Sequence, residues 1–96
     1  MNRNIIDKIK EISKVLAGEK SETEIANFMV EMLTQAELET LSKRWCILEM
    51  LMEGKTQREI AKELKVSLCK VTRGSKILKN RTSIAVKYLT KEKNNE

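Results

Sequence analysis

The side chains best suited to a chemical role in this chain lie close together between Thr56 and Arg73. Lys70, Thr72 and Arg73 would share the exposed face of a short helix that opens at Ser67. Cations and hydroxyls on such a face can donate hydrogen bonds to phosphate oxygens and to base edges. The surrounding segment has the pattern of two short helices joined by a tight turn, which predicts a helix-turn-helix. The chemistry that it indicates is recognition of duplex DNA.

Groups for bond-making catalysis are missing from the sequence. It contains no histidine, so a serine or cysteine would have no imidazole base, and no phosphate-binding glycine loop accompanies them. The usual zinc-ligand spacings are absent as well. Cys46 and Cys69 lie in helical patterns, and no apolar run has signal-peptide or transmembrane length. We therefore expect no enzyme, no catalytic residue, no metal and no membrane, and a cytoplasmic location.

Positive charge is concentrated in the carboxyl-terminal part of the chain. Residues 1–33 hold 5 basic and 6 acidic side chains, residues 34–54 hold 2 and 4, and residues 55–96 hold 12 and 4. The excess coincides with the predicted helix-turn-helix, whereas charge that served only solubility would be spread evenly. This distribution favours a polyanionic partner. A basic helical module that docks an acidic protein is the alternative.

Helix boundaries can be predicted from capping patterns, because the chain has no proline. Sequences of the form S/T-x-x-E begin at Ser21, Thr34 and Thr56, and each predicts a helix start. An apolar repeat at helical spacing predicts a first helix over 3–17, ended by Gly18 in the left-handed conformation. The amino-terminal half is therefore expected to be helical.

The longest apolar stripe begins at Thr34 and is stopped by Gly54, so this segment should form the central helix. The helices that follow are expected at 57–64, 68–79 and 83–91. The charged tail from Lys91 should be frayed. No strand pattern occurs, and the fold class predicted from the sequence is all-α with six helices.

Apolar residues at inward positions should hold the two helices of the helix-turn-helix together. The residues expected in this core are Ile60, Ala61, Leu64, Val66 and Val71. Lys65, in the turn, would cost about 1 kcal/mol in the left-handed conformation, unless the turn has another shape. Gly74 costs about 0.8–1.0 kcal/mol relative to alanine inside the second helix. Unless it is accidental, this glycine implies that a ligand or a neighbouring helix approaches the backbone closely.

Several of these residues together resemble the trp repressor family. The resemblance rests on Leu33-Thr34 with Glu37, Leu41 and Arg44, on Gln57-Arg58-Glu59, and above all on Val71-Thr72-Arg73-Gly74-Ser75 followed by Leu78-Lys79. It runs from about Met32 to Lys79, and the amino-terminal third matches only in being helical. It implies an intertwined all-helical homodimer that represses transcription on a palindromic operator. Its DNA-reading heads would move into position when the corepressor L-tryptophan binds.

The resemblance also implies roles for single residues. Those implied to bind L-tryptophan are Glu31, Leu33, Thr34, Arg44, Arg73, Gly74 and Ile77. Those implied to contact DNA are Arg58, Ser67, Leu68, Cys69, Lys70 and Thr72. Arg44 and Arg73 would enclose the indole, and Thr34 would help Arg44 to hold the carboxylate. The backbone carbonyls of the partner's Glu31 and the partner's Leu33 would receive the ammonium.

Two features separate the chain from a well-known member of the family. Ile77 replaces a serine that meets the ligand's ammonium, and a lost charged hydrogen bond costs about 1.5–3 kcal/mol. The turn from Gly54 to Gln57 is also one residue shorter than the enterobacterial pattern. A regulator of the same fold that binds DNA but does not use tryptophan is therefore an alternative.

Other interpretations are open for a few positions. Cys69 could touch a base edge, be a thiol open to oxidation, or pack, and Thr72 could face its own backbone. Trp45 and Cys46 are interpreted as dimer-core packing. Overall we expect a single domain. Its expected parts are dimerisation helices over 1–54, a DNA-reading head over 55–80, and a last helix and tail over 81–96.

Overall fold

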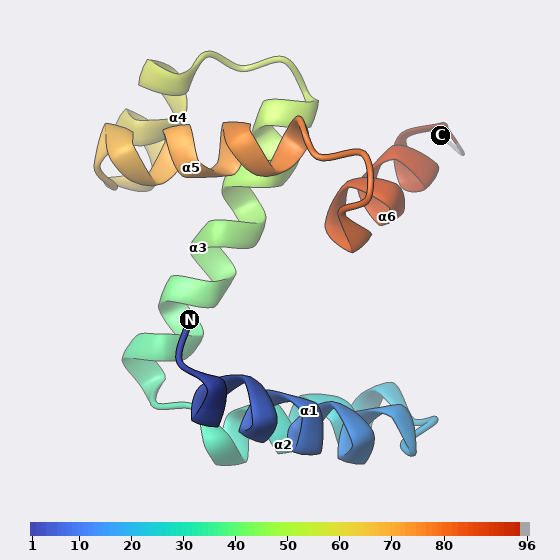
Figure 1. Cartoon of the computed structure of the whole chain (residues 1–96). Coiled ribbons are helices and arrows are strands. Elements are labelled where there is room, and N and C mark those ends of the chain that lie inside the picture. Colours follow the sequence, from blue (N-terminus) through green and yellow to red (C-terminus); the bar gives the residue numbers. More distant parts are fainter. Residues whose placement is uncertain (95–96) are drawn as a thin grey trace. The chain divides into compact units, whose positions relative to one another are not determined.

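The computed structural model describes residues 1–94 of the chain. In chain order its helices are α1 (Arg3–Ala17), α2 (Glu22–Met32), α3 (Gln35–Met52), α4 (Gln57–Leu64), α5 (Leu68–Leu78) and α6 (Ile84–Asn94), as Figure 1 shows. The chain divides into two compact units, Met1–Leu38 and Glu39–Glu96. The division that the sequence predicts at residues 54 and 80 stays a prediction.

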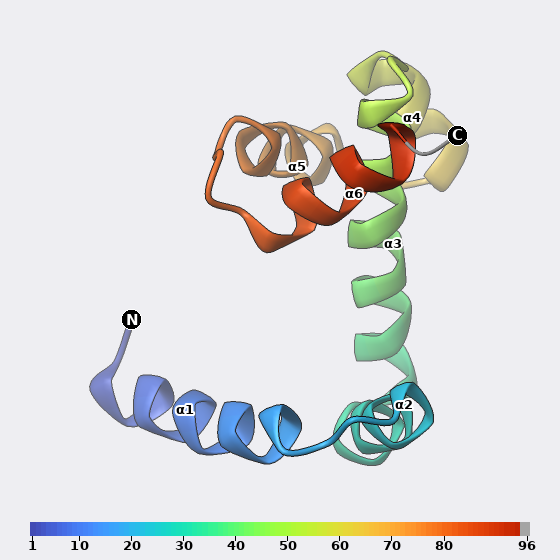
Figure 2. The same cartoon turned by 90° about the vertical axis from the view of Figure 1, so that its right-hand side faces the viewer.

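In the amino-terminal unit, α1 and α2 are not parallel: Figure 2 shows α2 nearly end-on and α1 from the side. The predicted span of α1 is confirmed. Gly18 was expected in the left-handed conformation, and this was wrong, because its φ is −80° and its ψ is −15°. Its N–H instead lies 3.2 Å from the Lys14 carbonyl and 3.3 Å from the Val15 carbonyl, so a tightened right-handed turn ends the helix.

All three predicted S/T-x-x-E sequences begin helices. At α4, the Thr56 hydroxyl accepts the Glu59 N–H at 3.2 Å, and the Glu59 carboxylate accepts the Thr56 N–H at 3.4 Å. At α3, Thr34 and Glu37 make the same reciprocal pair at 3.1 and 2.9 Å. At α2, the Ser21 hydroxyl accepts the N–H three residues later at 3.3 Å. Gly54, with a φ of 93°, follows the end of α3 as expected.

The core of the carboxyl-terminal unit lies where the helix-turn-helix packs on α3. Ile60 and Val71 are completely buried, and Ile47 and Met50 join them from α3. The other predicted inward residues, Ala61, Leu64 and Val66, pack against this cluster. In Figures 1 and 2, α4 and α5 lie side by side and α5 crosses α3. The predicted helix-turn-helix core is therefore confirmed.

The turn between α4 and α5 has the left-handed shape that makes Lys65 costly. Its φ is 55° and its ψ is 48°. We expect Lys65→Gly to raise the free energy of unfolding by up to about 1 kcal/mol, because glycine enters this region without a Cβ clash. Lys62→Gly, inside α4, should lower it by about 1 kcal/mol. Urea unfolding of both variants checks this, and equal shifts would contradict the role given to the turn.

At the carboxyl-terminal end, α5 ends one residue before its predicted bound and α6 continues to Asn94. The expectation of a frayed tail from Lys91 was wrong as far as Asn94, and residues 95 and 96 lie outside the described residues. Contacts of α6 include the buried Leu89 side chain, the Tyr88 ring 5.9 Å from the Trp45 ring, centroid to centroid, and the Lys93 ammonium, which donates to the Met52 carbonyl at 2.9 Å. That bond satisfies a carbonyl that the end of α3 would otherwise leave open.

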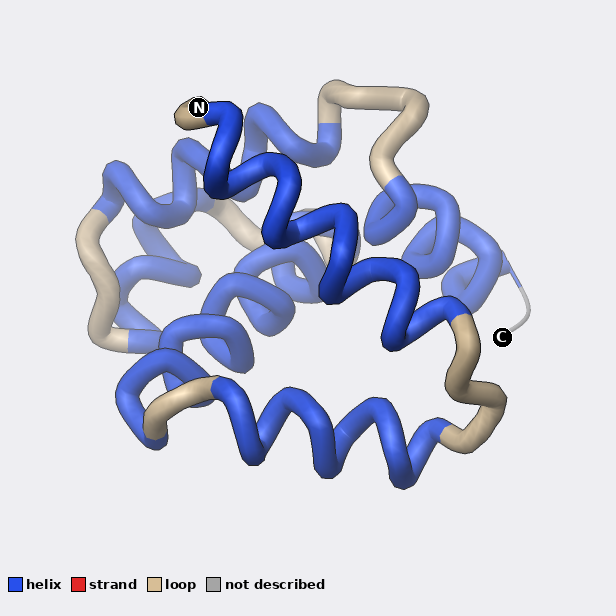
Figure 3. Tube along the Cα trace, turned by 60° about the horizontal axis from the view of Figure 1, so that its bottom comes forward, coloured by secondary structure: helices blue, strands red, loops and turns tan. Residues whose placement is uncertain are grey.

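Helices make up all regular structure in residues 1–94, with no strand among them (Figure 3). The predicted all-α, six-helix fold class is confirmed. Within the same residues, none of the helices combines the length and the apolar character that crossing a bilayer requires.

Candidate functional site

The first turn of α5 presents three exposed side chains next to one another. Ser67 precedes the helix, and its hydroxyl accepts the Lys70 N–H at 3.4 Å, which confirms it as the cap. Leu68, Cys69 and Lys70 follow, and all three are exposed. The Cys69 thiol is free. These predicted DNA-contacting residues therefore lie together on one accessible turn.

Thr72, one turn further along α5, is engaged inside the protein. Its hydroxyl lies 2.9 Å from the Gln57 amide oxygen of α4 and 3.0 Å from the Leu68 carbonyl of its own helix. The interpretation that Thr72 faces its own backbone is confirmed. A hydroxyl has one proton to donate, and here that proton serves contacts that tie α5 to α4. A groove contact by Thr72 stays a prediction.

The cations of the helix-turn-helix are largely free of acidic partners. Lys55 and Glu63 form an ion pair at 3.1 Å. Among the described residues, Arg58, Lys70 and Arg73 form none, and all three are exposed. Unpaired cations on neighbouring helices give this surface a positive potential that attracts an anion.

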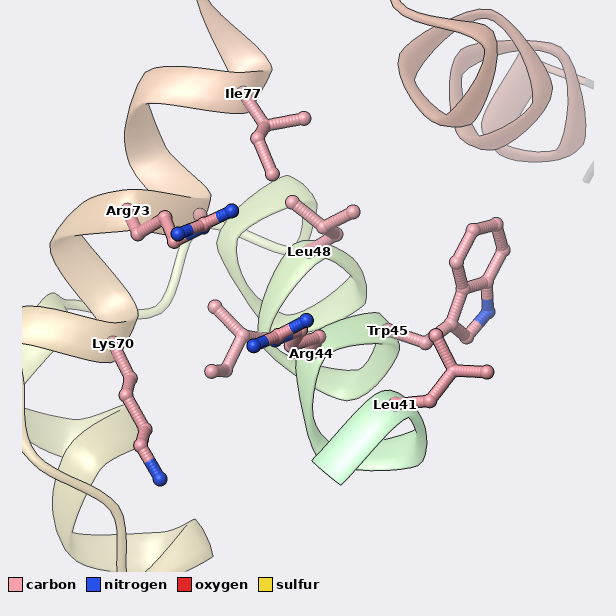
Figure 4. A pocket seen from close by; sticks show the side chains of 9 residues that line it. Leu41, Arg44, Trp45, Leu48, Lys70, Arg73 and Ile77 are labelled. Atoms are coloured by element: carbon pink, nitrogen blue, oxygen red, sulfur yellow. The ribbon is translucent and has the colours of Figure 1, made fainter. Parts of the chain in front are cut away.

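A cavity of about 150 Å³ lies between α3 and α5 (Figure 4). From α3 it is lined by Leu41, Arg44, Trp45, Ile47 and Leu48, and from α5 by Lys70, Arg73, Gly74 and Ile77. In Figure 4, Arg73 extends from α5 toward α3, and Arg44 projects from α3 beside the same space. The Lys70 ammonium points away from both guanidiniums. The pocket thus combines apolar walls with two cationic groups.

Four of the residues predicted to bind the ligand come together in this pocket. Arg44, Arg73, Gly74 and Ile77 all line it. Glu31, Leu33 and Thr34 belong to the amino-terminal unit. There the Thr34 hydroxyl caps α3, and a ligand role for these three residues stays a prediction.

The space at Gly74 is taken by a neighbouring helix. A Cβ built on Gly74 would lie 2.6 Å from the Ile47 Cγ2 atom and 3.5 Å from the Leu51 Cδ1 atom. The closer distance is shorter than real carbon contacts, so only glycine lets α5 approach α3 this closely. Of the two explanations for the glycine, the structure supports the approach of a helix.

The sequence interpretation did not place Leu41, Trp45 or Leu48 at the ligand site. Trp45 was interpreted as dimer-core packing, which stays a prediction; within this chain the residue is 39% exposed and its ring lies 5.9 Å from the Tyr88 ring, centroid to centroid. A signal was present, because positions 41, 44, 45 and 48 follow helical spacing and so share one face of α3. Positions 70, 73, 74 and 77 repeat that spacing on α5.

A metal centre finds no support in residues 1–94. Within them, no cluster of histidine, cysteine or acidic side chains could hold an ion.

A comparison with protein families agrees with this geometry. The family model described as Trp repressor protein matches residues 7–93, which includes the helix-turn-helix, the pocket residues and most of α1 and α6. Searches of curated proteins and of solved structures returned no significant match. The match extends well beyond the segment in which the resemblance was visible by eye. The chain belongs to the Trp repressor family, whose members are non-enzymatic, DNA-binding transcriptional repressors.

Proposed function

We propose that the protein is a homodimeric repressor that binds a palindromic operator and responds to L-tryptophan as its corepressor. One observation carries the proposal: α5 has exposed residues on its first turn and a pocket bordered by two arginines on another face. One helix can therefore serve DNA and a small molecule together. Family membership implies operator binding and dimerisation.

The DNA contacts would divide between affinity and sequence choice. Arg58 lies on α4, ahead of α5, the helix proposed to read the bases. It has no acidic partner among the described residues, which suits a phosphate contact. The side chains expected to face the major groove are Ser67, Leu68, Cys69, Lys70 and Thr72. In a two-fold dimer the two reading helices would lie about 34 Å apart and meet successive major grooves.

Exposed apolar residues of the amino-terminal unit support an intertwined dimer. Ile5, Ile9 and Val15 on α1 and Val30 on α2 are each more than half exposed. Apolar surface of this extent is characteristic of a protein interface, and a second copy of the chain would cover it in a two-fold assembly.

The pocket suits a flat aromatic carboxylate such as L-tryptophan. Arg44 and Arg73 have no ion pair in the described part of the chain, and a guanidinium both stacks on rings and binds carboxylates. The apolar walls would hold the indole. The partner's Glu31 and the partner's Leu33, with Thr34, would complete the site as the family resemblance implies. Binding would favour the DNA-competent arrangement of the reading heads.

Calorimetric titration with L-tryptophan tests the ligand. Arg73→Ala should weaken binding at least about tenfold, because a hydrogen bond to a charged group contributes about 1.5–3 kcal/mol. Arg81→Ala removes an exposed arginine that does not line the pocket, and it should leave binding unchanged. Absence of heat at millimolar L-tryptophan would favour a DNA-binding regulator of the same fold that does not use tryptophan.

A further inference from the structure

The groups on α5 that remain free to contact base edges are fewer than its sequence suggests. The Ser67 hydroxyl accepts the Lys70 N–H, and the Thr72 hydroxyl is engaged by Gln57 and the Leu68 carbonyl. The Thr72 hydroxyl proton is therefore used within the protein, whereas the Ser67 hydroxyl, held as the cap, keeps its own proton free to donate. Of the residues between 67 and 72 predicted to line the major groove, the side chains with no hydrogen bond or ion pair in the described residues are Leu68, Cys69 and Lys70.

These three side chains can make only a few kinds of contact with bases. Leu68 is 46% exposed and packs in no core cluster of the described residues. Cys69 adds a free, weakly polar thiol beside it. Lys70 has no acidic partner within residues 1–94, and its ammonium points away from the pocket arginines (Figure 4). The available set is one apolar group, one thiol and one cation.

The rest of α5 adds neither an amide nor a carboxylate. Its sequence from Leu68 to Leu78 contains no asparagine, glutamine, aspartate or glutamate. Adenine is best recognised by an amide that both donates and accepts, and cytosine by an acceptor for its amino group. The nearest amide, Gln57 of α4, is held by Thr72. The side chains best suited to adenine and cytosine are therefore missing from α5, which favours recognition of the two other bases.

We propose that α5 reads its operator half-site through a thymine methyl group, contacted by Leu68, and a guanine edge, contacted by Lys70. The inference rests on the proposed DNA binding and adds the base chemistry that determines specificity. Thymine is the base with a methyl group in the major groove, which an apolar side chain can cover. Guanine presents two acceptors there, N7 and O6, which suit a lysine ammonium.

The experiment selects duplexes from a randomised library with the full chain, in the presence and absence of L-tryptophan. The selected half-site should contain thymine and guanine at defined positions. Uracil at the thymine position removes only the methyl group and should lower the affinity about fourfold. 7-Deazaguanine at the guanine position removes N7 and should lower it about fivefold or more.

Protein variants then assign each base to its residue. Leu68→Ala should bind the uracil and thymine duplexes equally, and Lys70→Ala should bind the 7-deazaguanine and guanine duplexes equally. Two matched control variants should still bind the uracil and 7-deazaguanine duplexes more weakly than the unmodified duplex. Ile84→Ala removes an exposed apolar residue of α6, and Lys76→Ala removes an exposed lysine of the last turn of α5.

The outcomes separate this inference from the proposed function. A duplex that is selected but binds equally well with both base analogues would overturn the inference and leave DNA binding intact. If Leu68→Ala still loses affinity with uracil and Lys70→Ala still loses affinity with 7-deazaguanine, the assignment of thymine to Leu68 and of guanine to Lys70 is overturned. If no duplex is selected under either condition, the proposed DNA binding fails, and the inference fails with it.

Discussion

Replacing Arg58 and Lys70 together with alanine should lower the affinity for a selected duplex about 30-fold at physiological salt. Both side chains are exposed and have no acidic partner in the described residues, so each is available to displace counterions from DNA. Each phosphate charge neutralised makes the slope of log affinity against log salt steeper by about 0.9. Arg58→Ala alone should therefore make that slope shallower by about one. Fluorescence anisotropy with a labelled duplex measures both quantities.

The matched control removes two positive charges from α1 instead. Lys10→Ala with Lys14→Ala changes the net charge by the same amount at exposed positions outside the helix-turn-helix. Duplex affinity should stay within about twofold of the wild type, because neither lysine belongs to the residues proposed to contact DNA and net charge alone contributes little at physiological salt. Unchanged duplex binding after the loss of Arg58 and Lys70 would favour the alternative of a basic module that docks an acidic protein.

Gly74→Ala should lower the free energy of unfolding by up to about 2 kcal/mol, despite alanine's better helix propensity. The added Cβ would lie 2.6 Å from the Ile47 Cγ2 atom. That methyl group is attached close to the backbone of a residue that is 2% exposed, so it cannot swing aside. Overpacking of a core typically costs about 1–3 kcal/mol, and the propensity gain of at most about 1 kcal/mol offsets only part of it. Urea unfolding followed by circular dichroism measures the change.

Two further variants test whether contact with Ile47 causes the loss of stability in Gly74→Ala. Gly18→Ala adds a Cβ whose nearest contacts, at 3.5 and 3.7 Å, are ordinary, and its φ of −80° suits any residue. This control should not destabilise the chain by more than about 0.5 kcal/mol. In an Ile47→Ala background, Gly74→Ala should lose its cost, because the clashing methyl group is gone. The same cost in both backgrounds would show that helix contact is not the reason for the glycine.

Much of the fold could be predicted because its signals are local. The S/T-x-x-E sequences at Ser21, Thr34 and Thr56 each begin a helix through hydrogen bonds within one turn. The turn at Lys65 was located by the helix-turn-helix pattern, and of the two turn shapes left open the structure has the left-handed one, with a φ of 55°. The family match over residues 7–93 confirms the identification that these motifs suggested and, with it, the prediction that the protein is not an enzyme.

The errors arose at helix ends, where more than one set of hydrogen-bond partners is possible. A glycine can end a helix in either the left-handed or the right-handed backbone conformation. Gly18 has the right-handed one, with hydrogen bonds to the Lys14 and Val15 carbonyls. Helix α6 continues past its predicted end at residue 91 to Asn94, and there Lys93 donates a hydrogen bond to the Met52 carbonyl. No local sequence pattern predicts this bond. Helix ends are thus the least predictable feature when a distant group supplies the missing partner.

The pocket shows the same limit. Arg44, Arg73, Gly74 and Ile77 were proposed for it by resemblance, and the structure places them along one cavity. Trp45 belongs to the apolar stripe of the central helix, but such a stripe does not reveal whether it faces a second chain, a neighbouring helix or a ligand. The partner of Gly74 could not be named, because the crossing of α5 over α3 brings Ile47 to it from far away in the sequence.

The central claim is that α5 and the cations beside it bind duplex DNA. The most direct test is the affinity of the wild-type chain for a selected duplex, measured with L-tryptophan present over a range of salt concentrations. We predict that log affinity falls linearly as log salt rises, with a slope of about −0.9 for each phosphate contacted. An affinity that does not change as salt rises would contradict the claim.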